Sequence, residues 1–211
     1  TIIKLLTRSY EIKSGEIAVD NNSINNFELN NLRKNISVVP QDSFLFSDTI
    51  KNNIKFGNSK ATQKEIEKVC LIAGIDKEIK KFKDGYNTIL GERGINLSGG
   101  QKQRICIARA LIKKPKILIL DDCLSALDSK TERKIIDRLK KYIKNCTTLI
   151  SSHRISSVEA LDKIIVLDKG KIIQFGNHES LIKQEGYYKN LYIRQSSKKN
   201  NPIWYFLKKI F

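Results

Sequence analysis

The apolar run at residues 117–120, which stops at Asp121 and Asp122, constrains the fold of this chain more than any other feature. Four large aliphatic residues in succession end abruptly at two carboxylates. A short run that is apolar at every position is typical of a strand buried on both faces, as strands of a parallel sheet are. Ligands bind such sheets beyond the carboxyl ends of their strands. We therefore expect Asp121 and Asp122 to lie at a ligand-binding edge.

Further short apolar runs alternate along the chain with helical periodicity. This alternation predicts an α/β fold with a parallel sheet. The other predicted strands are residues 36–39, 147–150 and 163–167, and the predicted helices are residues 63–73, 101–112 and 130–143.

Residues 45–100 interrupt the alternation. They contain short helical patterns and a turn-rich stretch at residues 84–98, and no convincing strand. This pattern indicates a helical insertion in the sheet domain. Later in the chain, the polar run at residues 196–202 ends in a proline and indicates a linker.

The chain is long enough and apolar enough to bury a sizeable core. Its 211 residues are 40% hydrophobic, which is typical of a globular domain and excludes a disordered chain. No stretch approaches the roughly 18 continuous apolar residues of a membrane helix, and no apolar leader opens the sequence, so we expect neither a span nor an export signal in it. Because the sequence has no methionine and begins at Thr1, we expect a fragment or a trimmed chain.

A formal net charge of +17 leaves two interpretations of the surface. Such a charge suits binding to nucleic acid or to an anionic membrane surface. The lysines are scattered among many Asn and Ile residues, however, which favours a solvated, compositionally biased surface over a dedicated binding face. We therefore expect no specific nucleic-acid partner.

The four cysteines sit inside apolar segments and form no CxxC pair. We expect them to be reduced, packed residues of a cytosolic domain, with neither a metal site nor a disulfide. They are Cys70, Cys106, Cys123 and Cys146.

A Ser-Gly-Gly-Gln segment at residues 98–101 opens one of the predicted helices. Ser98 is a good N-cap, and the two glycines after it let a ligand approach the backbone N–H groups at the positive end of the helix dipole. The segment predicts either an anion site or an ordinary serine-capped helix start.

Three motifs follow one another in an informative order: LSGGQKQR at residues 97–104, ILILDDCLSALD at 117–128 and ISSHR at 150–154. Together they resemble the nucleotide-binding domain of ABC transporters. Upstream, VPQDSFLFSDTI at residues 39–50 resembles the Q-loop region of ABC exporters, and GERG at 91–94 resembles the exporter stretch that contacts loops of the transmembrane domain.

The resemblance implies a P-loop NTPase (RecA-like) fold, an α/β fold with a parallel sheet core and the inserted ABC helical subdomain at about residues 45–100. It covers residues 1–195, which it identifies as an ABC ATP-binding domain, and leaves residues 196–211 as a basic aromatic tail. Apolar residues recur at helical spacing from Ile203 to Phe211, which predicts either an amphipathic end piece or a frayed C-terminus.

The family motifs imply ATP and Mg²⁺ as cofactors and assign roles to residues of this sequence. Asp121 matches the aspartate that holds Mg²⁺. Gln41 would contact Mg²⁺ or the attacking water, and Asp122 would polarise that water. His153 would hydrogen-bond the γ-phosphate, against the alternative of an incidental loop histidine. The other histidine, His178, is expected only at a helix start capped by asparagine.

The signature helix of this family faces ATP held by the opposite subunit. Ser98, Gly99, Gly100 and Gln101 would therefore bind ATP in trans, and Asp128 matches the D-loop aspartate. The implied partners are a second nucleotide-binding domain, in a heterodimer or a homodimer, and the transmembrane domain of an exporter.

Two departures from the family pattern qualify these expectations. The phosphate-binding motif GxxGxGK[ST] is absent, and residues 1–6 resemble the helix that follows it. We therefore expect that the chain begins just after the motif and that the isolated fragment is inactive.

The second departure is Asp122, where the family usually has glutamate. Its carboxylate is shorter by one methylene, about 1.5 Å. The Asp-Asp pair resembles one branch of multidrug-type exporters that work as unequal pairs, in which one composite site hydrolyses ATP slowly. The alternative is a sluggish base in a homodimer.

The sequence thus predicts an ATPase subunit or domain of an ABC exporter, which couples ATP hydrolysis to transport at the cytoplasmic face of the cell membrane. Two alternatives stay open. One is a soluble ABC-type ATPase acting on nucleic acid or the ribosome, and the other is a non-catalytic remnant of a split exporter gene.

Overall fold

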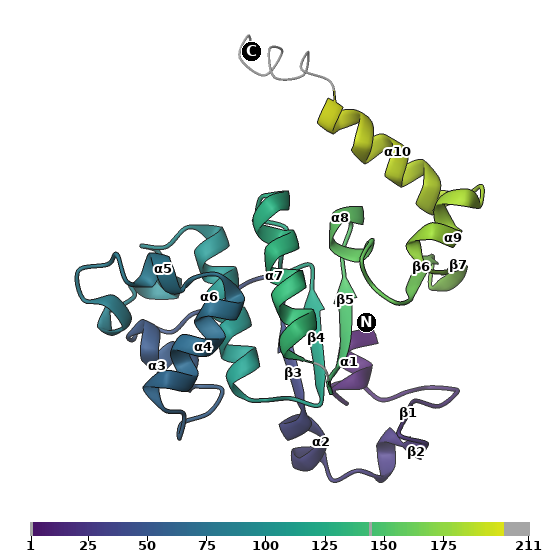
Figure 1. Ribbon diagram of the computed structural model, residues 1–211. Coiled ribbons are helices and arrows are strands. Elements are labelled where there is room, and N and C mark those ends of the chain that lie inside the picture. The colour runs from purple at the N-terminus through teal and green to yellow at the C-terminus, as the bar shows by residue number, and fades with distance from the viewer. Residues whose placement is uncertain (1, 144, 201–211) are drawn as a thin grey trace. The chain divides into compact units, whose positions relative to one another are not determined.

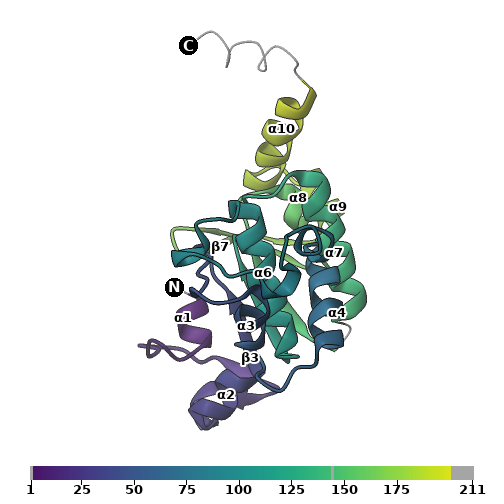
Figure 2. The same cartoon turned by 90° about the vertical axis from the view of Figure 1, so that its left-hand side faces the viewer.

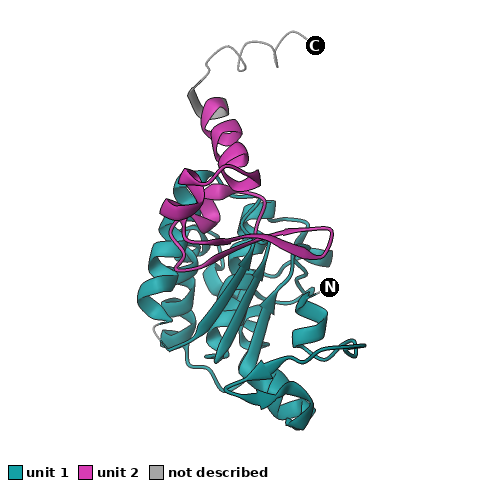
Figure 3. Cartoon of the chain, turned by 90° about the vertical axis from the view of Figure 1, so that its right-hand side faces the viewer, with its two compact units in different colours: residues 1–151 teal, residues 152–211 magenta. Residues whose placement is uncertain are grey.

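The computed structural model describes residues 2–143 and 145–200. The chain divides into two compact units, residues 1–151 and residues 152–211, which Figure 3 colours separately. Within the described residues, no helix combines the length and the apolar character that crossing a membrane requires.

A three-stranded parallel sheet forms the centre of the first unit (Figure 1). Its strands are β3 (Ile36–Val39), β4 (Ile117–Asp121) and β5 (Thr147–Ser151), in the order β3-β4-β5. Val39 pairs with Leu120, and Asp121 pairs with Ser151. The predicted strands at residues 36–39, 117–120 and 147–150 are confirmed, and their carboxyl ends share one edge of the sheet.

Helices cover both faces of this sheet because the apolar side chains of β4 alternate between two cores. Leu118 and Leu120 belong to the larger core, together with side chains of α6 (Gly99–Ile112) and α7 (Ser129–Tyr142). Ile119 belongs to a second core with side chains of α1 (Ile2–Leu6), η1 (Ile24–Asn26) and α2 (Leu29–Asn35). A strand buried on both faces was predicted from the same run of residues.

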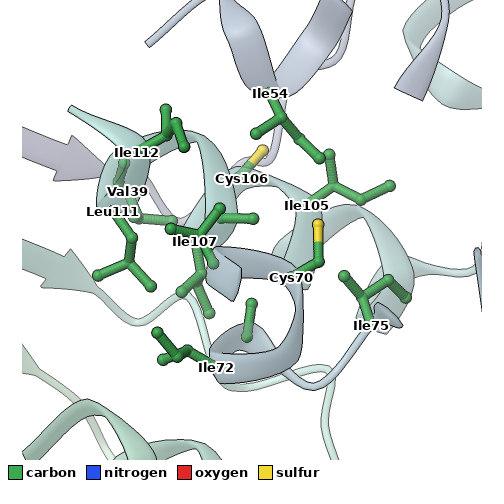
Figure 4. Close-up of a cluster of buried hydrophobic side chains, with 14 of the residues drawn as sticks. Val39, Ile54, Cys70, Ile72, Ile75, Ile105, Cys106, Ile107, Leu111 and Ile112 are labelled. Atoms are coloured by element: carbon green, nitrogen blue, oxygen red, sulfur yellow. The ribbon is translucent and has the colours of Figure 1, made fainter. Parts of the chain in front are cut away.

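Residues 45–100 form the predicted helical segment. It contains α3 (Ile50–Lys55), α4 (Gln63–Ala73), α5 (Asp76–Ile79), η2 (Gly85–Asn87) and η3 (Glu92–Gly94). α3 and α4 both pack against α6 (Figure 2). Figure 4 shows that side chains of all three helices meet in the larger core, where Cys70 and Cys106 are buried.

Local signals explain where α4 begins and ends. Thr62 and Glu65 form a capping box at its start, and Gly74 ends it with a left-handed φ of 74°. The four cysteines are free, and Cys70, Cys106 and Cys123 are buried, whereas Cys146 is partly exposed.

A hairpin, β1 (Ala18–Val19) and β2 (Asn22–Ser23), was not predicted. Its two turn residues, Asp20 and Asn21, have positive φ, which suits a two-residue hairpin turn.

The second unit corrects one strand assignment. It contains α8 (Ile155–Val158), β6 (Ile164–Asp168), β7 (Lys171–Gly176), α9 (His178–Lys183) and α10 (Tyr187–Asn200). Residues 163–167 were predicted as a strand of the parallel sheet, but β6 pairs antiparallel with β7. The reason is the Lys169-Gly170 turn, in which both residues have positive φ and close a tight hairpin.

Two predictions concern the end of this unit. His178 opens α9, and the Asn177 side chain caps that helix, as expected. The linker expected from residue 196 is wrong up to Asn200, because α10 continues to that residue. Residues 201–211 and their predicted amphipathic pattern lie outside the described residues.

Candidate functional site

Asp121 and Asp122 lie at the carboxyl end of β4. Asp121 is the last residue of the strand, and the Asp122 N–H donates to the carbonyl of Ser151 at 2.9 Å. The backbone turns sharply at Asp122, whose φ of 44° lies in the left-handed region. Aspartate tolerates this region better than most residues. The Ser125 hydroxyl donates to the Asp122 carbonyl at 2.8 Å and stabilises the turn.

Gln41 follows the neighbouring strand. It lies two residues after β3 ends at Val39, the residue that pairs with Leu120, and it is exposed. Gln41 therefore lies beyond the end of one strand, and the two aspartates lie at the end of the adjacent strand. Both strand ends are at the same edge of the sheet. The ends of β3 and β4 are neighbours, as the parallel arrangement requires.

The Ser-Gly-Gly-Gln segment forms the start of α6. The Ser98 hydroxyl accepts from the Gln101 N–H at 3.2 Å, and the Gln101 side-chain oxygen accepts from the Ser98 N–H at 2.9 Å. This capping box engages both polar side chains. The first N–H groups of a helix have no partner within the helix, and they carry the positive end of the dipole. An anion can therefore be bound by the backbone at Gly99 and Gly100.

The start of α6 packs closely against the loop that follows the aspartates. A Cβ at Gly100 would lie 2.9 Å from Cδ2 of Leu127 and 3.4 Å from the carbonyl oxygen of Ala126. Gln103, which is buried, accepts a hydrogen bond from the Ala126 N–H at 3.2 Å. Gly100 thus packs closely against Leu127 of this chain, a contact that the sequence interpretation in terms of ligand access did not include.

Gln101 and Arg104 are held by a carboxylate of the helical segment. Arg104 donates to both oxygens of Glu78, at 2.5 and 3.0 Å, and Gln101 donates to Glu78 at 3.0 Å. Burial raises the pKa of Glu78, but the hydrogen bonds from Arg104 and Gln101 outweigh it, so the pKa lies below its usual value. Gln101 and Arg104 are three residues apart and share one face of the helix, which is a weak hint of this cluster in the sequence.

Asp128 has a structural role of its own. Its carboxylate accepts from the N–H groups of Lys130 and Thr131, each at 3.0 Å, and caps α7. Hydrogen bonds from the side chain and backbone of Thr131, with a further one from Lys130, hold the pKa of Asp128 below its usual value. The N-cap role is therefore a sufficient reason for an aspartate at position 128, whether or not Asp128 also contacts a second subunit.

His153 belongs to the second unit and is exposed. Its carbonyl oxygen accepts from the side-chain amide of Gln195 at 2.7 Å, and the Gln195 side-chain oxygen accepts from the Ile155 N–H at 2.9 Å. Gln195 on α10 thus fixes the backbone on both sides of Arg154. No local pattern in the sequence indicates this contact, because it joins residues far apart in the chain.

Three aromatic side chains from the start of the helical segment contact one another. Phe44, Phe46 and Phe56 are all exposed, and we call these three side chains the aromatic surface. The Leu90 N–H donates to the Asp48 carbonyl at 3.0 Å, which places the segment of exposed Ile89 beside the loop that contains Phe46.

Among the residues that the structure describes, no group of three or more His, Cys, Asp or Glu side chains gathers as a metal cage would require. Mg²⁺ needs no such cage, since it is usually held by one or two carboxylates together with substrate phosphates and water. A strand-end carboxylate such as Asp121 fits that mode of binding.

Comparisons with known proteins agree on one family. The family model described as "ABC transporter" matches residues 1–125. The chain is 51% identical over 92% of its length to "Multidrug resistance-like ATP-binding protein MdlA" of Buchnera aphidicola subsp. Schizaphis graminum, of which it covers 34%. It is 48% identical over 90% of its length to "Putative export ATP-binding/permease protein RT0691" of Rickettsia typhi, of which it covers 33%.

A solved structure agrees with these relatives. The chain superposes on a bacterial Atm1-family ABC exporter with ATP bound, with a TM-score of 0.89 and 40% identity, covering 92% of this chain and 34% of that one. The chain therefore spans about a third of the length of the curated relatives it matches.

Proposed function

Because this chain belongs to the ABC transporter family, we propose that it is the ATP-binding part of an ABC exporter, in which ATP binding and hydrolysis are coupled to transport. The observation that carries the proposal is the shared carboxyl edge of the sheet, where Asp121 ends β4, Asp122 follows it and Gln41 follows β3. Phosphates and their metal ion bind at that edge in open α/β sheets.

In this proposal, Asp121 and Gln41 hold Mg²⁺ on ATP. The ion would neutralise charge on the phosphates during transfer. Asp122 would polarise the attacking water, and His153 would hydrogen-bond the γ-phosphate. The backbone at Gly99 and Gly100, with Ser98 and Gln101, would bind the γ-phosphate of ATP held by a second nucleotide-binding domain.

The short carboxylate of Asp122 favours an unequal pair of sites. A displacement of about 1 Å at a catalytic base can cost on the order of a hundredfold in rate. We therefore propose that the composite site containing Asp122 is the slower one, in a heterodimer whose other subunit supplies the faster site. The alternative is a homodimer with two slow sites. Measuring the rate of ATP hydrolysis at each of the two sites distinguishes these possibilities.

The aromatic surface supports a transmembrane partner. Large apolar side chains that gather on a surface are typical of protein–protein contacts, where aromatic residues supply much of the binding energy. Phe44 and Phe46 lie in the segment that resembles the exporter Q-loop region. We propose that these residues and Phe56 contact the transmembrane part of the exporter at the cytoplasmic face of the cell membrane.

A relative named as an export protein and a solved structure of an ABC exporter favour this function over a soluble ATPase acting on nucleic acid or the ribosome and over a non-catalytic remnant. The net charge of +17 was the feature that suggested nucleic acid. Its lysines are spread over the chain, so the charge requires no dedicated binding face.

The test is ATP hydrolysis by the assembled transporter, with its transmembrane part and both nucleotide-binding domains. Asp121→Asn should lower turnover at its site by about a hundredfold or more, the order of effect when an electrostatic stabiliser is lost. Asp137→Asn, at an exposed position of α7, is the matched control and should leave turnover unchanged. Equal turnover in the two variants would contradict the proposed role of the sheet edge.

A further inference from the structure

Arg109 lies on α6 and forms three hydrogen bonds with the segment before and within α3. Its guanidinium donates to the Asn53 carbonyl, the Asn53 side-chain oxygen and the Phe44 carbonyl, each at 2.8 Å. Partial burial lowers the pKa of Arg109, but a guanidinium stays charged in proteins. These are charge-assisted hydrogen bonds in a fixed fork geometry, which a lysine cannot reproduce.

Asn53 extends this contact to the adjacent loop. It is only 1% exposed. Its amide nitrogen donates to the carbonyls of Phe46 and Thr49, at 3.0 and 3.1 Å, and its side-chain oxygen accepts from the Phe46 N–H at 2.9 Å. One buried amide therefore fixes the backbone of residues 46–49.

The aromatic surface rests on the same two residues. The Arg109 guanidinium lies 5.4 Å from the ring centre of Phe46 and 6.0 Å from that of Phe56. The Phe46 ring also contacts Phe44 and Phe56, with centroid distances of 5.1 and 4.7 Å. Phe56 is nevertheless 70% exposed, so one ring face packs inward while much of the side chain meets solvent.

Gly57, next to Phe56, adds an independent constraint. A Cβ at Gly57 would lie 2.2 Å from the carbonyl oxygen of Arg109. The end of α3 therefore approaches the backbone of α6 so closely that only glycine fits.

We propose that Arg109 and Asn53 act as positioning residues, which hold Phe44, Phe46 and Phe56 as one preformed surface for the transmembrane partner and join that surface to α6. Ser98 caps the start of α6, so Arg109, which supports the surface, and the proposed phosphate-binding turn belong to the same helix. This inference rests on the proposed function, because it assigns a partner to the surface that the two residues support.

The first experiment measures amide hydrogen exchange in the assembled transporter. Arg109→Lys keeps the charge but loses the fork geometry, so amides of residues 44–49 should exchange about tenfold faster or more. Arg138→Lys is the matched control, since Arg138 also donates to a backbone carbonyl, that of Leu71, on another part of the first unit. Unchanged exchange at residues 44–49 in Arg109→Lys would overturn the inference.

The second experiment measures contact with the transmembrane part by cross-linking and ATP hydrolysis by steady-state kinetics. In Phe56→benzoylphenylalanine, light should cross-link this position to the transmembrane part, and adding Arg109→Lys should lower the yield about fivefold or more. Arg109 touches no proposed nucleotide ligand, so Arg109→Lys should lower kcat about fivefold while KM for ATP stays within about twofold. If Arg109→Lys acted only by damaging the fold, Arg138→Lys should lower the cross-linking yield equally.

The outcomes separate the two proposals. A wild-type protein that forms no cross-link with the transmembrane part would overturn the proposed function of the surface, and this inference with it. A wild-type cross-link that persists undiminished in Arg109→Lys would overturn the inference alone.

Discussion

The side-chain oxygen of Gln103 accepts a hydrogen bond from the Ala126 N–H at 3.2 Å and ties α6 to the loop that follows Asp121 and Asp122. Gln103 is 5% exposed, so the bond forms largely out of water. Since Gly100 packs against Ala126 and Leu127 as well, two contacts fix this loop to the helix. The start of α6 and residues 122–128 therefore form one structural element.

Replacing Gln103 tests this element. Gln103→Met keeps the side-chain volume but leaves the Ala126 N–H without its acceptor, so the free energy of unfolding should fall by about 1 kcal/mol. Urea titration of the chain measures this. Gln63→Met is the control, because Gln63 is exposed and its side chain donates to Glu67, one turn along α4. A loss for Gln103→Met no larger than that for Gln63→Met would contradict the structural role of the bond.

The two glycines of α6 should respond differently to alanine. In Gly100→Ala the new methyl group meets Leu127, which must shift, so the free energy of unfolding should fall by about 1 kcal/mol. In Gly99→Ala the new Cβ lies 3.6 Å from Cβ of Ala126, an ordinary contact, and stability should stay within about 0.5 kcal/mol. Thermal unfolding of both variants decides the matter, and equal losses would mean that the close approach at Gly100 costs nothing.

Asp122→Glu extends the carboxylate by about 1.5 Å. If the short side chain limits hydrolysis, single-turnover ATP hydrolysis at the site containing it should rise in the assembled transporter, with little change in ATP affinity. The φ of 44° at this position disfavours glutamate, so stability should fall by about 1 kcal/mol. Turnover that stays equal or falls would contradict the geometric explanation.

The ion pair between Glu65 and Lys114 predicts that the free energy of unfolding depends on pH. Hydrogen bonds from Lys114 and then Thr62 lower the pKa of Glu65 from 4.5 to about 2. Because the pKa is depressed in the folded state, the pair stabilises the protein above pH 4.5, and this contribution is lost as the pH falls towards about 2. Glu65→Gln keeps a residue suited to the capping box and removes the charge.

Urea unfolding of wild type and Glu65→Gln at several pH values checks this expectation. Wild type should have the higher midpoint at pH 7, and the difference should shrink between pH 4.5 and about 2 and in high salt. If the midpoints of wild type and Glu65→Gln differed by the same amount at both ends of this pH range, the Glu65 carboxylate would not be the cause of the difference.

Local patterns predicted the three strands of the parallel sheet and the helices α4, α6 and α7. The run at residues 117–120 predicted a doubly buried strand, and Ser98 predicted a capped helix, because burial pattern and capping depend on residues a few positions apart. The hairpin of β6 and β7 was misassigned, since the Lys169-Gly170 turn is a weaker signal than the apolar run before it. The aspartates were placed at the sheet edge because parallel strands share their carboxyl ends.

By itself the sequence determined the three strands of the parallel sheet, the helices α4, α6 and α7, the order of the motifs and the position of Asp121 and Asp122 at a strand end, since each of these follows from residues close together in the chain. Only the tertiary structure decided that Gln103 holds Ala126, that Gly100 packs against Leu127 and that Arg109 holds Asn53 and Phe44. These contacts join segments far apart in sequence, and they form because packing helices onto the sheet buries polar groups that must then find partners.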